Sequence, residues 1–372
     1  MRNFYKHVFL CLVLSGGSIP TLAGEIIAIK ADRIDTVTSG LIENGIIVIQ
    51  GGKISAIGAD VEIPDTANII DAHDKTVFPG IVNPMSRIGL SAPQSRGPAS
   101  HPNYRIADEL YPFQDSYKRI LQAGFTTLGF VPWGNGITGQ GAITRSFGKT
   151  TEEMLIVKSG LLMINYQAND KAKKVIKGAL ESAKKQMKST DPKIKPLVRA
   201  LQGEIPTFVQ CRRPSETLHL LKVLKPYNKL KLVLIAGAEN YLIANKLAEN
   251  KIPVIFPAQI DFEQFTRNRI NVPKILDNAG VKIACRPKTD NIQGYEDFLR
   301  EMAELVKSGL DKEIAKKSIT IYPAEMLGIN YRLGSLEVGK DANLLILSGD
   351  PLDVGTQIHQ IMLEGKIVYQ TP

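Results

Sequence analysis

The chain of 372 residues is 44% hydrophobic and 22% charged, which is typical of a globular protein and excludes a disordered or fibrous one. This length accommodates one barrel of about 250 residues together with a small companion domain. The formal net charge is +9, but no aromatic residue lies within the lysine-rich stretch 171–195, so we expect no nucleic-acid partner.

The N-terminus has the features of a secretory signal. Arg2 and Lys6 supply positive charge, the apolar run Val8–Leu14 is too short to span a bilayer, and Ala23 closes a small-residue cleavage site. We therefore predict a signal peptide at residues 1–23. The protein is expected to be exported, either periplasmic or extracellular, without a stable membrane anchor.

Both ends of the mature chain are predicted to form β-structure. Short isoleucine-rich or leucine-rich runs, separated by turn signals, occur near each end. These runs are residues 26–29, 45–50, 53–57, 344–347, 358–363 and 366–369. Two strand-rich ends around a mixed middle indicate one small β domain, formed by residues 24–78 plus 331–372.

Residues 79–330 alternate apolar strand patterns with amphipathic helix patterns. The predicted strands are residues 126–131, 207–211, 231–235, 253–256 and 282–284, and the predicted helices are 116–123, 215–224, 240–249, 272–278 and 295–307. Such βα repeats favour a closed barrel of parallel strands. Cys211 and Cys285 fall in two strands that would not be neighbours, so we expect no disulfide between them.

A glycine-rich stretch and a lysine-rich stretch each have a sequence pattern that predicts local structure. Residues 134–141 are rich in glycine but lack the lysine of a P-loop and the spacing of a dinucleotide fingerprint, so we expect a loop at the active face rather than a phosphate cradle. Residues 171–188 have apolar positions at helical spacing, which predicts a helix with its lysines on the solvated face. A site for an anionic polymer or a membrane surface is the alternative for these lysines.

The segments Tyr322–Gly328, Leu333–Leu347 and Gly349–Pro351 are very similar to the region where amidohydrolases of the imidazolonepropionase and dihydroorotase type leave their barrel. Pro79-Gly80 resembles the start of the first barrel strand in the same superfamily. The resemblance implies an α/β fold: a TIM-like (β/α)8 barrel at 79–330 and a β-sandwich from both chain ends.

Members of this superfamily hold one or two divalent metals, usually zinc, between strand-end histidines and a carboxylate. Carried over position by position, the resemblance places other residues at the expected ligand positions. These are Met85 and Arg87 on the first strand, Gln210 and Arg212, then Ala236, and Lys288 in place of the catalytic Asp, with Asp290 two residues later. We therefore predict no metal cofactor, and expect zinc only if this alignment is misplaced.

The positions of the histidines also support the prediction that no metal is bound. His73 and His359 fall in the predicted β domain, His101 in a loop and His219 inside a helix, so none is expected at a barrel strand end. A hidden zinc site of the usual kind would need imidazoles at those strand ends.

Function does not follow from the fold alone, so two readings remain open. In the first, the protein is a pseudoenzyme that binds an anionic small molecule or a partner subunit. The ligand-binding candidates are Arg87, Gln210, Arg212, Arg286 and Lys288. Some of these side chains could instead pair with acidic neighbours and merely fill the old cavity.

In the second reading, the protein is an active hydrolase of amide or cyclic amide C–N bonds, with Glu239, Asp261 and Asp290 as acids or bases. Cys211 would need a nearby base to act as a nucleophile, and we expect no histidine there. As a further possibility, the chain forms a homo-oligomer, or a hetero-oligomer with a catalytically intact paralogue.

Overall fold

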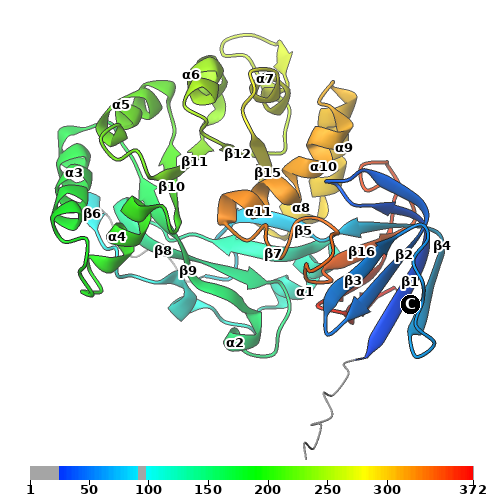
Figure 1. The fold of residues 1–372 in the computed structure, drawn as a ribbon. Coiled ribbons are helices and arrows are strands. Elements are labelled where there is room, and N and C mark those ends of the chain that lie inside the picture. Colours follow the sequence, from blue (N-terminus) through cyan, green and yellow to red (C-terminus); the bar gives the residue numbers. More distant parts are fainter. Residues whose placement is uncertain (1–24, 91–97, 372) are drawn as a thin grey trace, which may run out of the picture.

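The computed structural model describes residues 25–90 and 98–371. A seven-stranded sheet, in the order β18-β17-β16-β4-β1-β2-β3, takes strands from both ends of the described chain (Figure 1). The strands are β1 (Ile26–Asp35), β2 (Leu41–Gln50), β3 (Lys53–Gly58), β4 (Asn68–Pro79), β16 (Leu344–Leu347), β17 (Ile358–Leu363) and β18 (Lys366–Gln370). All the predicted terminal strands therefore form. Their hydrogen bonds join them into one continuous sheet, so the predicted sandwich of two sheets is not confirmed.

The seven-stranded sheet has its own apolar core. Its fully buried members include Ile29 of β1, Ile47 of β2, Val77 of β4 and Leu344 of β16. Alternate residues of each strand point to the same face, which explains why the isoleucine-rich runs pack together there.

The second sheet forms a nearly closed barrel. Its strands follow the order β5-β7-β8-β9-β10-β11-β12-β15, and no backbone ladder joins the two end strands within the described residues. The strands are β5 (Ile81–Ser86), β7 (Phe125–Phe130), β8 (Asn135–Arg145), β9 (Leu155–Asn165), β10 (Pro206–Cys211), β11 (Lys231–Ala236), β12 (Val254–Pro257) and β15 (Ile283–Arg286). The five predicted barrel strands are all present.

Strand β8 departs from the expected parallel barrel. It runs antiparallel to both of its neighbours, β7 and β9, and contains most of the glycine-rich stretch that was predicted to be a loop. The prediction of a loop was therefore wrong. The link between β7 and β8, residues 131–134, is too short for a crossover helix, so the chain turns back and β8 pairs antiparallel with β7. Gly139 lets the strand pass Tyr104, because a Cβ there would lie 2.6 Å from the Tyr104 carbonyl oxygen.

Helices surround the barrel strands and fill the predicted positions (Figure 1). They are α1 (Asp115–Gln122), α2 (Thr151–Met154), α3 (Asp170–Lys185), α4 (Lys195–Gln202), α5 (Pro214–Leu224), α6 (Ala244–Glu249), α7 (Val272–Asn278), α8 (Ile292–Glu296), α9 (Phe298–Lys307), α10 (Lys312–Ser318) and α11 (Ile321–Leu327). Short 3₁₀ helices lie at Ile106–Glu109 and Ala238–Ile243, and the short strands are β6 (Pro98–Ser100), β13 (Asp261–Phe262) and β14 (Arg269–Ile270). None of the described helices is both long and apolar enough to cross a bilayer.

Helix α3 is the predicted lysine-rich helix. Its buried residues are Ala172, Ile176, Leu180 and Ala183, which repeat at helical spacing. The side chain of Asn169 caps the start of the helix by accepting a hydrogen bond from the Ala172 nitrogen at 2.8 Å. The lysines are left on the outer face, as the pattern indicated.

Helix α11 closes the amino-terminal end of the barrel. Leu327 packs with Val82, Phe208 and other inward-pointing strand residues in one buried cluster. The carboxylate of Glu325 on this helix pairs with Lys282, the residue just before β15. The open end of the barrel is therefore the carboxyl end of the strands.

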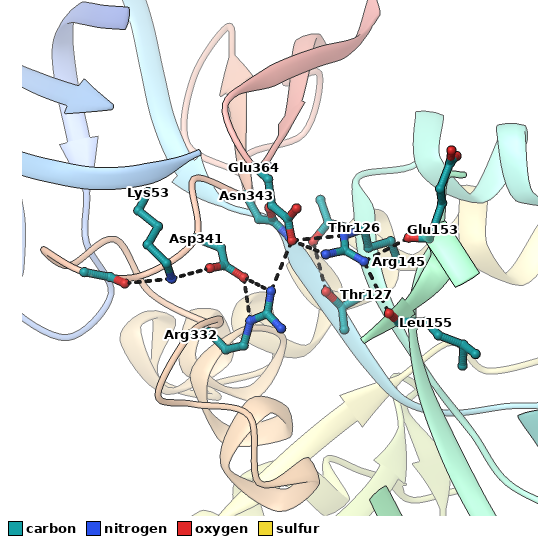
Figure 2. Close-up of polar contacts among 11 residues, drawn as sticks. Lys53, Thr126, Thr127, Arg145, Glu153, Leu155, Arg332, Asp341, Asn343 and Glu364 are labelled. Atoms are coloured by element: carbon teal, nitrogen blue, oxygen red, sulfur yellow. Dashed lines mark hydrogen bonds and ion pairs between the residues drawn. The ribbon is translucent and has the colours of Figure 1, made fainter. Parts of the chain in front are cut away.

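A chain of ion pairs joins the seven-stranded sheet to the base of the barrel (Figure 2). Arg145, at the end of β8, donates to the carboxylate of Glu364 in the β17–β18 turn, and Arg332 donates to the same oxygen at 3.1 Å. Arg332 also donates to Asp341 at 2.6 Å, and Asp341 accepts from Lys53 at 2.8 Å. Both chain ends are thus bonded to the barrel through charged groups.

Candidate functional site

The alternation of each strand determines which side chains face the barrel mouth. Phe208 of β10 and Ala284 of β15 belong to the interior cluster, so Gln210 and Arg286, two residues further on, also point inward. Met85 packs against the same interior cluster. Ala236 instead packs in the layer between the sheet and the helices. The expectation that Ala236 occupies a ligand position at the mouth was therefore wrong by one residue.

Asp290 connects the two end strands of the barrel at the mouth. Its Oδ1 atom accepts hydrogen bonds from the Ser86 hydroxyl at 2.9 Å and from the Tyr295 hydroxyl at 3.1 Å. Its Oδ2 atom accepts from the backbone nitrogen of Arg87 at 2.6 Å. The amide of the buried Asn83 donates to Tyr295 at 2.7 Å, which completes the network. We call Asn83, Ser86, Asp290 and Tyr295 the seam cluster.

Two arginines lie beside the seam cluster and are largely buried. The guanidinium of Arg87 stacks on the ring of Trp133, 3.8 Å from its centroid, and donates to the Val131 carbonyl oxygen at 3.2 Å. Arg286 donates to the Pro287 carbonyl oxygen at 2.8 Å, while its buried Nε atom has no hydrogen-bond partner in the described chain.

The pKa values of both arginines reflect this burial. Burial lowers the pKa of Arg87 to about 10, with Asp290 opposing the change and Arg286 adding to it. The pKa of Arg286 is also lowered by burial, and Asp290 opposes that shift. Two desolvated cations that share a single nearby carboxylate make the mouth electropositive.

Lys288 does not belong to the seam cluster. It lines a separate cavity of about 410 Å³ with Gln259 and Glu301. Burial raises the pKa of Asp261, an effect that Gln259 and Lys288 oppose, and burial likewise raises the pKa of Glu301. The sequence candidates therefore divide between two places: Arg87, Arg286 and Asp290 at the seam, and Lys288 and Asp261 beside this cavity.

The remaining candidates are placed in neither group. Arg212 has an exposed side chain, and Glu239 lies in the 3₁₀ helix after β11. Cys211 is buried in the outer layer, where burial raises the pKa of its thiol to about 12, so it stays protonated at neutral pH. His219 hydrogen-bonds the hydroxyl of Tyr166. Cys211 and Cys285 are both free thiols.

Sequence reasoning missed part of the site. Ser86, Trp133 and Tyr295 were not candidates, since each is an ordinary residue at a strand end, in a link or in a helix. Asn83, which follows Pro79-Gly80 on the first barrel strand, was not a candidate either. The signal that could have found Tyr295 is its place in the helix directly after Asp290.

Among the described residues, one group has three potential metal ligands: Asp32, His73 and Asp74. It lies on β1 and β4 of the seven-stranded sheet, not at the barrel mouth. The Nδ1 atom of His73 is 2.9 Å from Asp32 Oδ1, and this hydrogen bond raises the pKa of His73. The group is largely exposed, with 73% of the His73 side chain accessible.

The chain matches known proteins in sequence and in fold. The model of the amidohydrolase family matches residues 212–369. The dihydroorotase of Mycobacterium leprae is 46% identical over 37 residues, which are 10% of this chain and 9% of that protein. The imidazolonepropionase of a Geobacillus species is 33% identical over 88 residues, 22% of this chain and 19% of that protein. The matched segments thus span less than a fifth of these curated relatives.

The solved structure of an amidohydrolase from Thermotoga maritima matches 93% of this chain and 100% of its own, with a TM-score of 0.83 and 25% identity. Residues 212–369 thus carry a region of the amidohydrolase family, and the nearly closed barrel agrees with the fold of that amidohydrolase. The chain resembles that structure over nearly all of its own length.

Proposed function

We propose that the barrel mouth binds the carboxylate of a small molecule, and that it does so without a metal ion. The observation that carries this proposal is the pair of largely buried guanidinium groups, Arg87 and Arg286, together with the buried Nε atom of Arg286, which has no hydrogen-bond partner in the described chain. An anion would supply the missing acceptor and offset the cost of burying two like charges. Guanidinium groups are well suited to carboxylates.

The residues at the mouth do not fit the superfamily's divalent metal. Met85, Gln210 and Arg286 point inward where zinc would need imidazole or carboxylate ligands. A dication would also be repelled by the neighbouring guanidinium of Arg87. The Asp290 carboxylate at the mouth already accepts hydrogen bonds from the Ser86 hydroxyl, the Tyr295 hydroxyl and the backbone nitrogen of Arg87.

On this proposal the protein is a pseudoenzyme, and we propose that it is exported to the periplasm or beyond. The signal peptide on which the export proposal rests lies outside the described residues. A partner subunit, either a second copy or an intact paralogue, is the alternative occupant of the same electropositive mouth.

The chain's single tryptophan gives a direct test, because Trp133 lies under Arg87 at the mouth. N-acetylglycine should change the Trp133 fluorescence and show saturable binding, whereas N-acetylglycinamide, which differs only in lacking the charge, should not. Inorganic phosphate serves as the second anion, to distinguish a carboxylate site from a phosphate site. Equal responses to the acid and the amide would contradict the proposal.

Variants locate the response within the mouth. Arg286→Met should weaken the binding of N-acetylglycine by about tenfold or more, because it removes a charge-assisted hydrogen bond worth roughly 1.5–3 kcal/mol. Arg267→Met is the matched control, since Arg267 is exposed and lines neither the mouth nor the cavity. An unchanged affinity in Arg286→Met would place the anion elsewhere.

The second candidate function is hydrolysis of an amide or cyclic amide bond, as the names of the relatives suggest. The seam cluster favours it, because a carboxylate with hydroxyl neighbours at the carboxyl end of the strands is placed as catalytic groups of barrels are. Turnover of a cyclic amide by metal-free protein, lost in Asp290→Asn, would support this function. If no turnover is seen with or without added zinc, hydrolysis is excluded for that substrate and ligand binding is the function that stands.

A further inference from the structure

A cavity of about 410 Å³ lies beside the barrel mouth, outside the seam cluster. One wall follows strand β12 and includes Gln259 and Phe262, and the opposite wall is helix α9 with Glu301. Lys288, two residues after β15, lines it as well. Some of the charged side chains that line the cavity form ion pairs and others do not, and those without an ion pair indicate which kind of ligand would fit.

Two of the cations at the cavity are already neutralised. Arg269 forms an ion pair with Glu304, which also lines the cavity, and Arg300 pairs with Asp297 at 3.0 Å. These pairs are largely exposed to solvent and contribute little attraction for a ligand.

Lys288 and Glu301 carry opposite charges that attract each other without direct contact between the charged groups. The Lys288 ammonium has no hydrogen bond or ion pair to any described residue, and the two side chains form no ion pair with each other. The backbone of Lys288 hydrogen-bonds the Glu301 carboxyl group, but the buried Oε2 atom of Glu301 has no partner among the described residues. A buried carboxylate oxygen without a donor is costly, so a bound donor would be favourable there.

We infer that this cavity binds a zwitterion of the free α-amino acid class, with Lys288 holding its carboxylate and Glu301 holding its ammonium group. A simple anion would satisfy Lys288 and leave Glu301 unmatched, and a simple amine would do the reverse. Phe262, Ile260 and Ala258 add apolar surface to the same cavity, which favours an amino acid with an apolar side chain. This site is independent of the anion site proposed at the mouth, because the two share no residue.

Calorimetric titration of the full chain with three matched compounds tests the inference. L-leucine carries both charges, 4-methylpentanoate lacks the ammonium group, and 3-methylbutylamine lacks the carboxylate. L-leucine should bind at least about tenfold more tightly than either of the other two, since each lacks one charged contact. Equal affinity for all three, or no binding of L-leucine at millimolar concentration, would overturn the inference.

Substitutions then assign the two contacts. Lys288→Met should remove the advantage of L-leucine over 3-methylbutylamine, and Glu301→Gln should remove its advantage over 4-methylpentanoate. Lys307→Met, on the exposed end of α9, is the control and should bind L-leucine like the unaltered protein. Arg286→Met should keep L-leucine binding while weakening the binding of N-acetylglycine at the mouth, which separates the two sites. Unchanged preferences in both Lys288→Met and Glu301→Gln would overturn the assignment.

Discussion

The Oδ2 atom of Asp290 accepts a hydrogen bond of 2.6 Å from the backbone nitrogen of Arg87, a residue 203 positions away in the chain. This contact lies where the first and last strands of the barrel meet without a backbone ladder. A carboxylate thus joins the two edges at a point where parallel strands would ordinarily be joined by the sheet itself.

Asp290→Asn should lower the free energy of unfolding by about 1–2 kcal/mol, because an amide replaces a charged acceptor of three hydrogen bonds in a partly exposed setting. Urea denaturation measures the loss. Asp60→Asn serves as the control, since Asp60 is exposed and lies in the link between β3 and β4 of the seven-stranded sheet. If the two variants unfold at the same urea concentration, Asp290 does not hold the barrel edges together.

Lys316→Met should destabilise the protein by about 3–5 kcal/mol, because the change leaves buried carboxylates without their cation. The side chain of Lys316 is 8% exposed and pairs with Asp35 at 2.7 Å and Asp350 at 3.0 Å, across the junction of barrel and sheet. Differential scanning calorimetry measures the change in melting temperature. Lys317→Met, one residue along the same helix, is the control, and an equal melting temperature for the two variants would count against the ion cluster.

The same ion cluster predicts how stability depends on pH. Burial alone would raise the pKa of Asp350, but the backbone nitrogen of Leu352 and the Lys316 ammonium lower it overall below its ordinary value of 3.8. A lowered folded-state pKa contributes stability above pH 3.8 that is lost as the pH falls through that folded-state value. Stability measured from pH 6 to pH 2 should therefore fall less steeply in Asp350→Asn; parallel curves would show that Asp350 does not contribute.

Metal analysis by plasma mass spectrometry on protein supplied with zinc, and purified without a histidine tag, should find no tightly held ion at the mouth. His73→Asn identifies the source of any zinc that is found, because Asp32, His73 and Asp74 form the one described group of three potential ligands. Zinc retained equally by the protein and by His73→Asn would mean that the mouth binds metal after all.

Gly139→Ala should destabilise the barrel by about 2 kcal/mol or more, because φ there is +133° and an added Cβ would meet the Tyr104 backbone. Gly178→Ala is the matched control on helix α3, where a Cβ meets nothing within 4 Å. That change should stabilise by about 0.5–1 kcal/mol through helix propensity. Equal unfolding midpoints for the two variants would contradict the close approach of Gly139 to the Tyr104 backbone.

Most of the fold could be predicted from local patterns. The apolar runs of β10, β11, β12 and β15 and the amphipathic helices after them gave the correct elements, because period and composition depend on neighbours in the sequence. The direction of β8 could not be predicted in the same way, since a glycine-rich stretch is compatible with either a loop or a closely packed strand.

The candidate site was predicted in part. Arg87, Arg286 and Asp290 do meet at the mouth, because residues that follow parallel strands share one end of the barrel. Ala236 was misplaced because a shift of one residue turns a strand side chain to the opposite face. Lys288 and Glu301 were not recognised as a pair, since only the tertiary structure brings helix α9 against the residues that follow β15.

The central position of β4 has a consequence for synthesis of the chain. Strand β4 pairs with β1 on one side and with β16 on the other, and β16 begins only at Leu344. During synthesis, the edge of β4 that pairs with β16 therefore stays unpaired until the ribosome has made nearly all of the chain. The seven-stranded sheet is thus completed last, and a truncated product would carry an open, aggregation-prone strand edge.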